Sequence, residues 1–164
     1  MGKKKNQHSL WADIAFGLVA GAIATFVMDK VGSYGYQLED EQARHYEEAL
    51  RHEDPPEVLA GKIAEAIGSV ELDKEAKQKY GMAIHWGYGI VWGGVFGALR
   101  DRVPLVGSAG GMTFGLGLWL IGDELMMPVM KLSPPSTEFP WQNHARAAVN
   151  HFVYSGTFWL NPPL

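Results

Sequence analysis

Uncharged, mostly apolar positions gather in four stretches of the chain. Residues 14–28, 80–99, 103–122 and 147–164 contain no Asp, Glu, Lys or Arg. An α-helix needs about 20 residues to cross the hydrocarbon core of a bilayer, and the second and third stretches have that length. Soluble amphipathic helices keep one polar face, which these two stretches lack. We therefore predict an all-α fold, an integral membrane four-helix bundle.

The predicted bundle is a single membrane domain over residues 1–164. Its four spans are expected at about residues 11–36, 80–100, 103–127 and 141–161. An extramembrane helical insertion, about residues 37–79, separates spans one and two. The alternative is a water-soluble bundle whose core contains the same four segments.

The insertion is charged and is expected to be helical. Twelve acidic and six basic residues lie between residues 33 and 80. Asp54, followed by Pro55 and Glu57, is typical of a helix start. Four apolar residues then repeat at helical spacing: Leu59, Ile63, Ile67 and Val70. They predict a helix with one apolar face, lying on the bundle or among lipid head groups.

Glycines recur every fourth residue in three of the apolar segments. Each glycine costs about 1 kcal/mol relative to Ala in an aqueous helix, whereas in lipid glycines allow helices to approach closely. The rows are Gly17 and Gly21; Gly89, Gly93 and Gly97; and Gly107, Gly111 and Gly115. We predict that they are helix-packing positions. A row that is not used for packing within the bundle could instead bind a second copy, giving a homo-oligomer, or another membrane protein.

Composition restricts the function classes further. Hydrophobic residues make up 47% of the chain and charged residues 20%, and the mean hydropathy is -0.08. These averages resemble those of soluble proteins because the insertion carries so many of the charges. The net charge of -4 and the lack of a basic stripe argue against nucleic-acid binding. The absence of cysteine excludes disulfides, thiolate metal sites and a cysteine nucleophile.

Basic residues near the span ends predict the orientation. Lys3, Lys4 and Lys5 precede span one, and Arg100 and Arg102 lie between spans two and three. Positive charge favours the cytoplasmic side. We therefore expect a multi-pass protein in the lipid bilayer with both termini in the cytoplasm and the insertion outside. No small-x-small cleavage site follows span one, so we expect it to remain uncleaved.

Several short motifs resemble a known family. They are Gly115–Trp119 (GLGLW), Gly122-Asp123-Glu124, Leu132–Pro135 (LSPP), Pro140-Trp141, His144 and His85-Trp86. Together they resemble the YagU-like family of bacterial inner-membrane proteins of unknown function, over the part of the chain from residue 80 to the end. The resemblance implies a small polytopic protein of the bacterial inner membrane and implies no chemistry.

Ionisable residues within membrane spans are costly and often functional. Six are candidates here: Asp29, His85, Asp123, Glu124, His144 and His151. In antiparallel spans, late residues of spans one and three meet early residues of spans two and four. We therefore expect this polar cluster in the outer part of the bundle, with His151 two turns deeper than His144.

Three interpretations of the polar cluster remain open. The acids could be neutralised by Lys30, Lys131 and Arg146 as a structural arrangement. They could form a proton or ion relay with the histidines, since imidazole titrates near physiological pH. They could also bind a divalent metal such as Zn, Fe or Mn, because imidazole and carboxylate suit these ions. No cofactor is required by the sequence.

A second histidine set lies in the insertion. His45, Glu48 and His52 share one helix face, and we interpret them as a solvated face in preference to a metal site. The chain contains no P-loop, no dinucleotide fingerprint and no G-x-S-x-G motif, so no enzyme is predicted. Two function classes remain: a small transport or proton-handling membrane protein, and an accessory subunit of a membrane complex.

Overall fold

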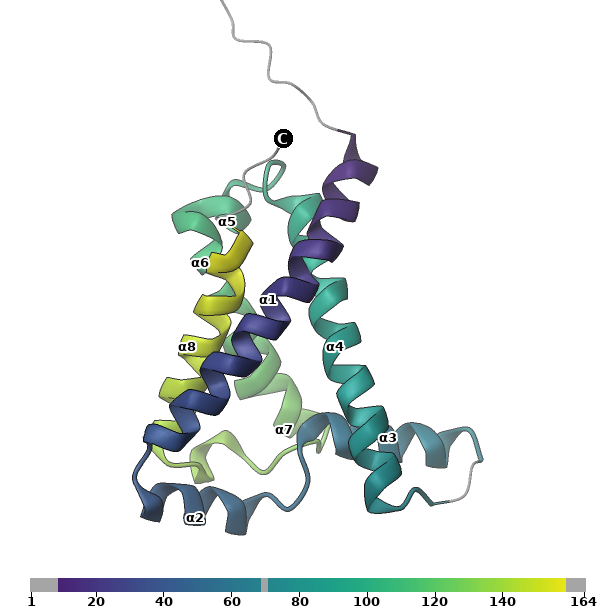
Figure 1. Ribbon diagram of the computed structural model, residues 1–164, viewed down its shortest axis with the longest axis vertical. Helices are drawn as coiled ribbons and strands as arrows, with labels where there is room; N and C mark the ends of the chain where they lie inside the picture. The colour runs from purple at the N-terminus through teal and green to yellow at the C-terminus, as the bar shows by residue number, and fades with distance from the viewer. Residues whose placement is uncertain (1–8, 69–70, 159–164) are drawn as a thin grey trace, which may run out of the picture.

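The computed structural model describes residues 9–68 and 71–158, and their regular structure is entirely helical (Figure 1). Three long helices run the length of the molecule: α1 (Leu10–Leu38), α4 (Lys74–Leu99) and α8 (Trp141–Thr157). A fourth column contains α5 (Pro104–Gly107), η1 (Ser108–Gly111), α6 (Met112–Gly117), η2 (Leu118–Met126) and α7 (Met127–Val129). The connections contain α2 (Glu41–Leu50), α3 (Pro55–Ala66) and η3 (Ser136–Glu138). The all-α prediction is confirmed.

The start of α1, the end of α8 and α5 all lie at one end of the molecule, whereas α2 and α3 lie at the opposite end (Figure 1). At the first end, Arg102 Nη1 donates to Asp13 Oδ2 over 2.9 Å and joins the α4–α5 turn to α1. Lys3, Lys4 and Lys5 and residues 159–161 of the fourth expected span lie outside the described residues.

Two helical stretches are long and apolar enough to cross a membrane, judged by length and composition. They are Leu10–Leu38, with 29 residues, and Pro104–Val129, with 26. Helix α4 is rich in Gly, Trp and Tyr, and α8 contains Arg146 and several Asn and His residues, which lowers the hydropathy of both. Membrane-span character is therefore found, within the described ranges, for two of the four expected spans.

Helices α1 and α4 touch along their backbones because their glycines face each other. A Cβ atom on Gly93 would lie 2.5 Å from Gly21 Cα, and one on Gly97 would lie 3.1 Å from Gly17 Cα. A side chain at Gly93 would therefore force the helices apart. The first two expected rows, Gly17 and Gly21 with Gly89, Gly93 and Gly97, lie at this contact.

The third expected row does not lie on one straight helix. The backbone has positive φ at three consecutive residues: Ala109 (49°), Gly110 (67°) and Gly111 (86°). This left-handed conformation, which glycine adopts readily, turns the chain between α5 and α6. Gly111 and Gly115 consequently approach Ser155 of α8, whereas Gly107 packs on the backbone of Arg100. Gly107 therefore does not share one helix surface with Gly111 and Gly115.

An aromatic core fills the space between the columns at the α5 end. Phe96 stacks on Phe158 with ring centroids 4.6 Å apart, and its ring is 5.1 Å from that of Phe114. Nearby, the Tyr154 hydroxyl donates to the Gly89 carbonyl oxygen. The buried Thr25 hydroxyl donates to the Gly21 carbonyl oxygen within α1. These two buried hydroxyls are therefore paired with backbone oxygens.

Helix α2 is tied to α8 by ion pairs with little exposure. The Arg146 guanidinium donates to Glu39 over 2.6 Å and to both oxygens of Glu47 over 2.7 and 2.8 Å. Arg51 donates to Glu47 over 2.6 Å. We call these four residues the α2 clamp. The Arg146 and Glu47 side chains are 13% and 5% exposed. Solvent therefore screens these charges little, and each is neutralised by its ion-pair partner.

Helix α3 begins at Pro55 with Asp54 as its N-cap, as the sequence predicted. Its small residues Ala60 and Ala64 are buried, and α4 approaches closely because Gly81 has no side chain to hold it off Glu57. Of the predicted apolar face, Ile63 and Ile67 instead project outward and are 46% and 74% exposed, while Val70 lies outside the described residues.

Candidate functional site

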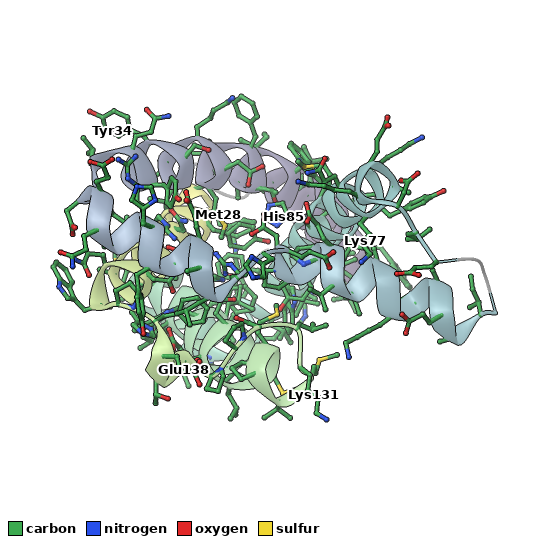
Figure 2. All side chains as sticks on the ribbon, turned by 90° about the horizontal axis from the view of Figure 1, so that it is seen from below. Met28, Tyr34, Lys77, His85, Lys131 and Glu138 are labelled. Atoms are coloured by element: carbon green, nitrogen blue, oxygen red, sulfur yellow. The ribbon has the colours of Figure 1, made fainter. Side chains whose placement is uncertain are left out.

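A cavity of about 770 Å³ lies between α1, α3, α4, η2 and α8. Small-molecule sites typically have volumes of about 300–1,000 Å³. Five of the six candidate residues contribute to its wall: His85, Asp123, Glu124, His144 and His151. In the view along the columns, Met28 and His85 lie near the centre of the molecule, whereas Tyr34, Lys131 and Glu138 lie at its periphery (Figure 2).

Asp29 is the sixth candidate, and it reaches the cavity through His85. Its Oδ1 atom lies 2.8 Å from His85 Nε2, so α1 and α4 each contribute one member of an acid–imidazole pair. About a third of each side chain is exposed. His85 lines the cavity, whereas Asp29 contacts His85 and is not part of the cavity wall.

The fourth column and α8 form two further pairs. Glu124 Oε1 lies 2.7 Å from His144 Nδ1, and Asp123 Oδ2 lies 3.6 Å from His151 Nδ1. The latter nitrogen also lies 3.0 Å from the carbonyl oxygen of Ala147. The structure thus joins all six candidate residues in three acid–imidazole pairs.

The two carboxylates that are adjacent in sequence lie on η2, which has π-helical geometry. A π-helix has a wider turn than an α-helix and occurs frequently at functional sites. The segment Leu118–Met126 is π-helical and carries Asp123 and Glu124 near its centre. Both carboxylates line the cavity, and each meets a different histidine of α8.

Each pair can hold one exchangeable proton. A carboxylate with an imidazolium, or a carboxylic acid with a neutral imidazole, has no net charge. Loss of the proton leaves one negative charge at the pair. The three pairs place three carboxylates against three imidazoles, and five of these six groups line the cavity.

Sequence reasoning missed other polar residues of the cavity wall. They include Arg51, Tyr88, Asn143, Asn150 and Tyr154. One signal could have identified two of them, because Asn143-His144 and Asn150-His151 repeat with a spacing of seven residues on α8. The Asn150 Oδ1 atom is buried and has no hydrogen-bond partner among the described residues, so it is free to accept a hydrogen bond.

Two of the three basic partners proposed for the acids, Arg146 and Lys30, make other contacts. Arg146 belongs to the α2 clamp, and the Lys30 ammonium lies 5.4 Å from the centroid of the Phe26 ring. Within residues 9–68 and 71–158, no ion pair joins Lys30, Lys131 or Arg146 to the acids of the three pairs. The acids are paired with histidines instead.

No group of three or more His, Asp or Glu residues in the described part of the chain is arranged to hold a metal ion. Among the described residues, the three acid–imidazole pairs therefore do not combine into one metal site. In the insertion, His45 lies 3.5 Å from Glu41 and 3.6 Å from Glu48 on an exposed surface. His52 does not complete a metal site with them.

Two hydrogen-bonded pairs at the insertion contain a group with a shifted pKa value. The Tyr36 hydroxyl donates to Glu48 Oε1 over 2.6 Å, and this hydrogen bond lowers the pKa of the Glu48 carboxyl. Lys77 donates to Glu53 over 2.8 Å, which raises the pKa of the Lys77 ammonium. Both pairs connect the insertion to the long helices.

Residues 44–159 match a protein family that is described as "Protein of unknown function (DUF1440)". The match extends from α2 to the end of α8. It includes five of the six paired residues, while Asp29 precedes it. No curated protein and no solved structure matches the chain significantly.

Proposed function

The chain belongs to the DUF1440 family of proteins of unknown function, and we propose that it is a four-span membrane protein that passes protons through its cavity. The observation that carries this proposal is the set of three acid–imidazole pairs, five of whose six members line one cavity. The resemblance to YagU-like proteins supports a location in the bacterial inner membrane.

Apolar side chains on the outside of the helices support the membrane setting. On α1, Phe16, Val19, Ile23 and Phe26 are exposed, and on the fourth column Leu120, Ile121, Leu125 and Val129 are exposed. Monomeric soluble proteins rarely expose contiguous apolar patches larger than a few hundred Å². Only 28% and 17% of the most apolar windows in these two stretches are buried, which is unlike the core of a soluble protein.

The positions of the ionisable groups fit this setting. A charged side chain facing lipid at mid-depth costs about 2.5–3.5 kcal/mol on insertion scales. Asp29, Asp123 and Glu124 avoid that cost because each faces a histidine within the bundle. A pair that shares one proton is neutral, so the site can lose and regain a proton one pair at a time.

The glycine contacts favour a self-contained bundle over the accessory-subunit alternative. Gly17 and Gly21 are covered by α4, and Gly115 is covered by α8. Five of the eight row glycines therefore meet at the α1–α4 contact and are used within the chain. A partner that binds through these rows would have to displace a helix of the same molecule.

Proton flux across liposomes tests the proposal. Purified protein is reconstituted with a pH-sensitive dye inside, and a potassium diffusion potential drives proton entry. We expect flux above that of protein-free liposomes, lost when Asp123→Asn and Glu124→Gln are combined. The control is Glu138→Gln, an exposed acid of η3 outside the cavity. Flux equal to protein-free liposomes, or unchanged in the combined variant, would refute proton passage.

A further inference from the structure

The cavity wall combines two kinds of side chain. A polar band is formed by His85, Asp123, Glu124, His144 and His151, and flexible apolar side chains lie beside it. Four of the seven methionines of the chain line the cavity: Met28, Met126, Met127 and Met130. Methionine side chains are flexible and polarisable, and they are common on surfaces that accept ligands of varied shape. Such a wall suits an organic molecule with a large apolar surface better than it suits a bare ion.

Aromatic rings border the polar band on the α5 side. Along α4, Tyr88 and Trp92 follow His85 by about one and two helical turns, and all three line the cavity. The rings of Tyr88 and Trp92 lie 5.9 Å apart edge to face, and Trp92 is likewise 5.9 Å from Phe114. The faces of such rings attract organic cations.

The charge of the cavity wall also favours a cation. The two guanidinium groups of the wall are already neutralised, because Arg146 binds Glu39 and Glu47, and Arg51 binds Glu47. Among the described residues, the ion-pair partners of Asp123 and Glu124 are histidines. Loss of the shared protons therefore leaves uncompensated negative charge next to the aromatic and methionine side chains.

We infer that the cavity binds lipophilic organic cations, such as amines or quaternary onium ions with large apolar groups. This inference rests on the proposed function, since the carboxylates that pass protons also receive the cation. The positive centre lies beside Asp123 and Glu124, and its apolar groups lie among the methionines, Trp92 and Phe114. Binding of one cation releases one proton from an acid–imidazole pair, so the charge of the site is conserved.

Two probes of equal shape and opposite charge test the ligand class. Tetraphenylphosphonium and tetraphenylborate are dialysed to equilibrium against the purified protein in detergent. We expect saturable binding of the phosphonium that is at least about tenfold tighter than that of the borate. In weakly buffered solution, a pH indicator should report one proton released for each phosphonium bound. Equal binding of the two ions would overturn the inference.

The variants include a matched pair of glycines. A Cβ atom at either Gly117 or Gly87 would meet nothing within 4 Å, but only Gly117 lines the cavity. Gly117→Leu should fill the cavity and abolish phosphonium binding, while Gly87→Leu should leave it unchanged. The combined Asp123→Asn and Glu124→Gln variant should weaken binding at least about tenfold. If the combined variant fails to fold, the comparison of Gly117→Leu with Gly87→Leu still tests the inference.

The outcomes separate this inference from the proposed function. Proton flux in liposomes without phosphonium binding would overturn the ligand class and leave proton passage standing. Phosphonium binding that depends on the carboxylates and on Gly117, without flux, would overturn proton passage and leave the ligand class standing. Phosphonium binding that survives Gly117→Leu and the combined carboxylate variant would place the probe outside the cavity and overturn the inference.

Discussion

Asp29 and His85 are 56 residues apart in the chain, yet their side chains meet at 2.8 Å where α1 and α4 cross. The crossing is close because glycines of both helices lie at the same contact. The packing of small residues thereby brings an acid of the first helix to a histidine of the cavity wall.

This pair should be energetically coupled. Asp29→Asn and His85→Gln should each lower the melting temperature in detergent, and the double variant should lower it by less than the sum. Residues in direct contact typically show coupling of about 0.5–3 kcal/mol. Thermal unfolding of the four proteins measures the coupling, and strictly additive shifts would show that the pair contributes nothing.

Gly93 should tolerate no side chain. Gly93→Ala introduces a Cβ atom 2.5 Å from Gly21 Cα, and overpacking of this kind typically costs about 1–3 kcal/mol. Gly87→Ala on the same helix is the control, because a Cβ atom there meets nothing within 4 Å. A lower melting temperature for the first variant only is expected. Equal shifts in both would contradict the observed α1–α4 contact.

The two ends of the molecule should lie on opposite sides of the membrane. The chain has no cysteine, so single cysteines can be introduced without background labelling. Gln42→Cys in α2 and Glu138→Cys in η3 should react with an impermeant thiol reagent in intact spheroplasts. Asp101→Cys, beside Arg100 and Arg102, should react only after permeabilisation. The reverse pattern would invert the proposed orientation.

Removal of Arg146 should release α2. Arg146→Gln leaves the buried Glu47 and Glu39 without their main partner, and breaking a buried ion pair typically costs about 3–5 kcal/mol. Hydrogen exchange of α2 should rise and the melting temperature should fall. Exposed Glu41→Gln in the same helix serves as the control. Unchanged exchange in α2 would show that the α2 clamp does not hold the helix.

The Tyr36–Glu48 hydrogen bond should stabilise the protein in a pH-dependent way. Because the pKa of Glu48 is lowered in the folded protein, its contribution is complete above the ordinary carboxyl value of 4.5 and is lost as pH falls through the lowered value. Tyr36→Phe should therefore lower the melting temperature at pH 7. The difference from the unaltered protein should shrink in acid, and a constant difference would contradict this linkage.

Local sequence signals determined the helices and many of their contacts. The uncharged stretches predicted the long helices, Asp54 and Pro55 predicted the start of α3, and the spacing of four between glycines marked the surfaces where α1 and α4 meet. These features could be predicted because helix periodicity and capping depend on residues that are close together in the chain.

Tertiary structure alone decided which partners meet. The turn at Ala109–Gly111 removes Gly107 from its expected row, and no local signal distinguishes this turn from a continuous glycine ladder. The acids could have met Lys30, Lys131 and Arg146, but Arg146 binds Glu39, which follows α1, and Glu47 of α2. The acids therefore meet histidines instead. Pairing across helices depends on their crossing and rotation, and these follow from packing of the whole bundle, which residue types along one helix do not specify.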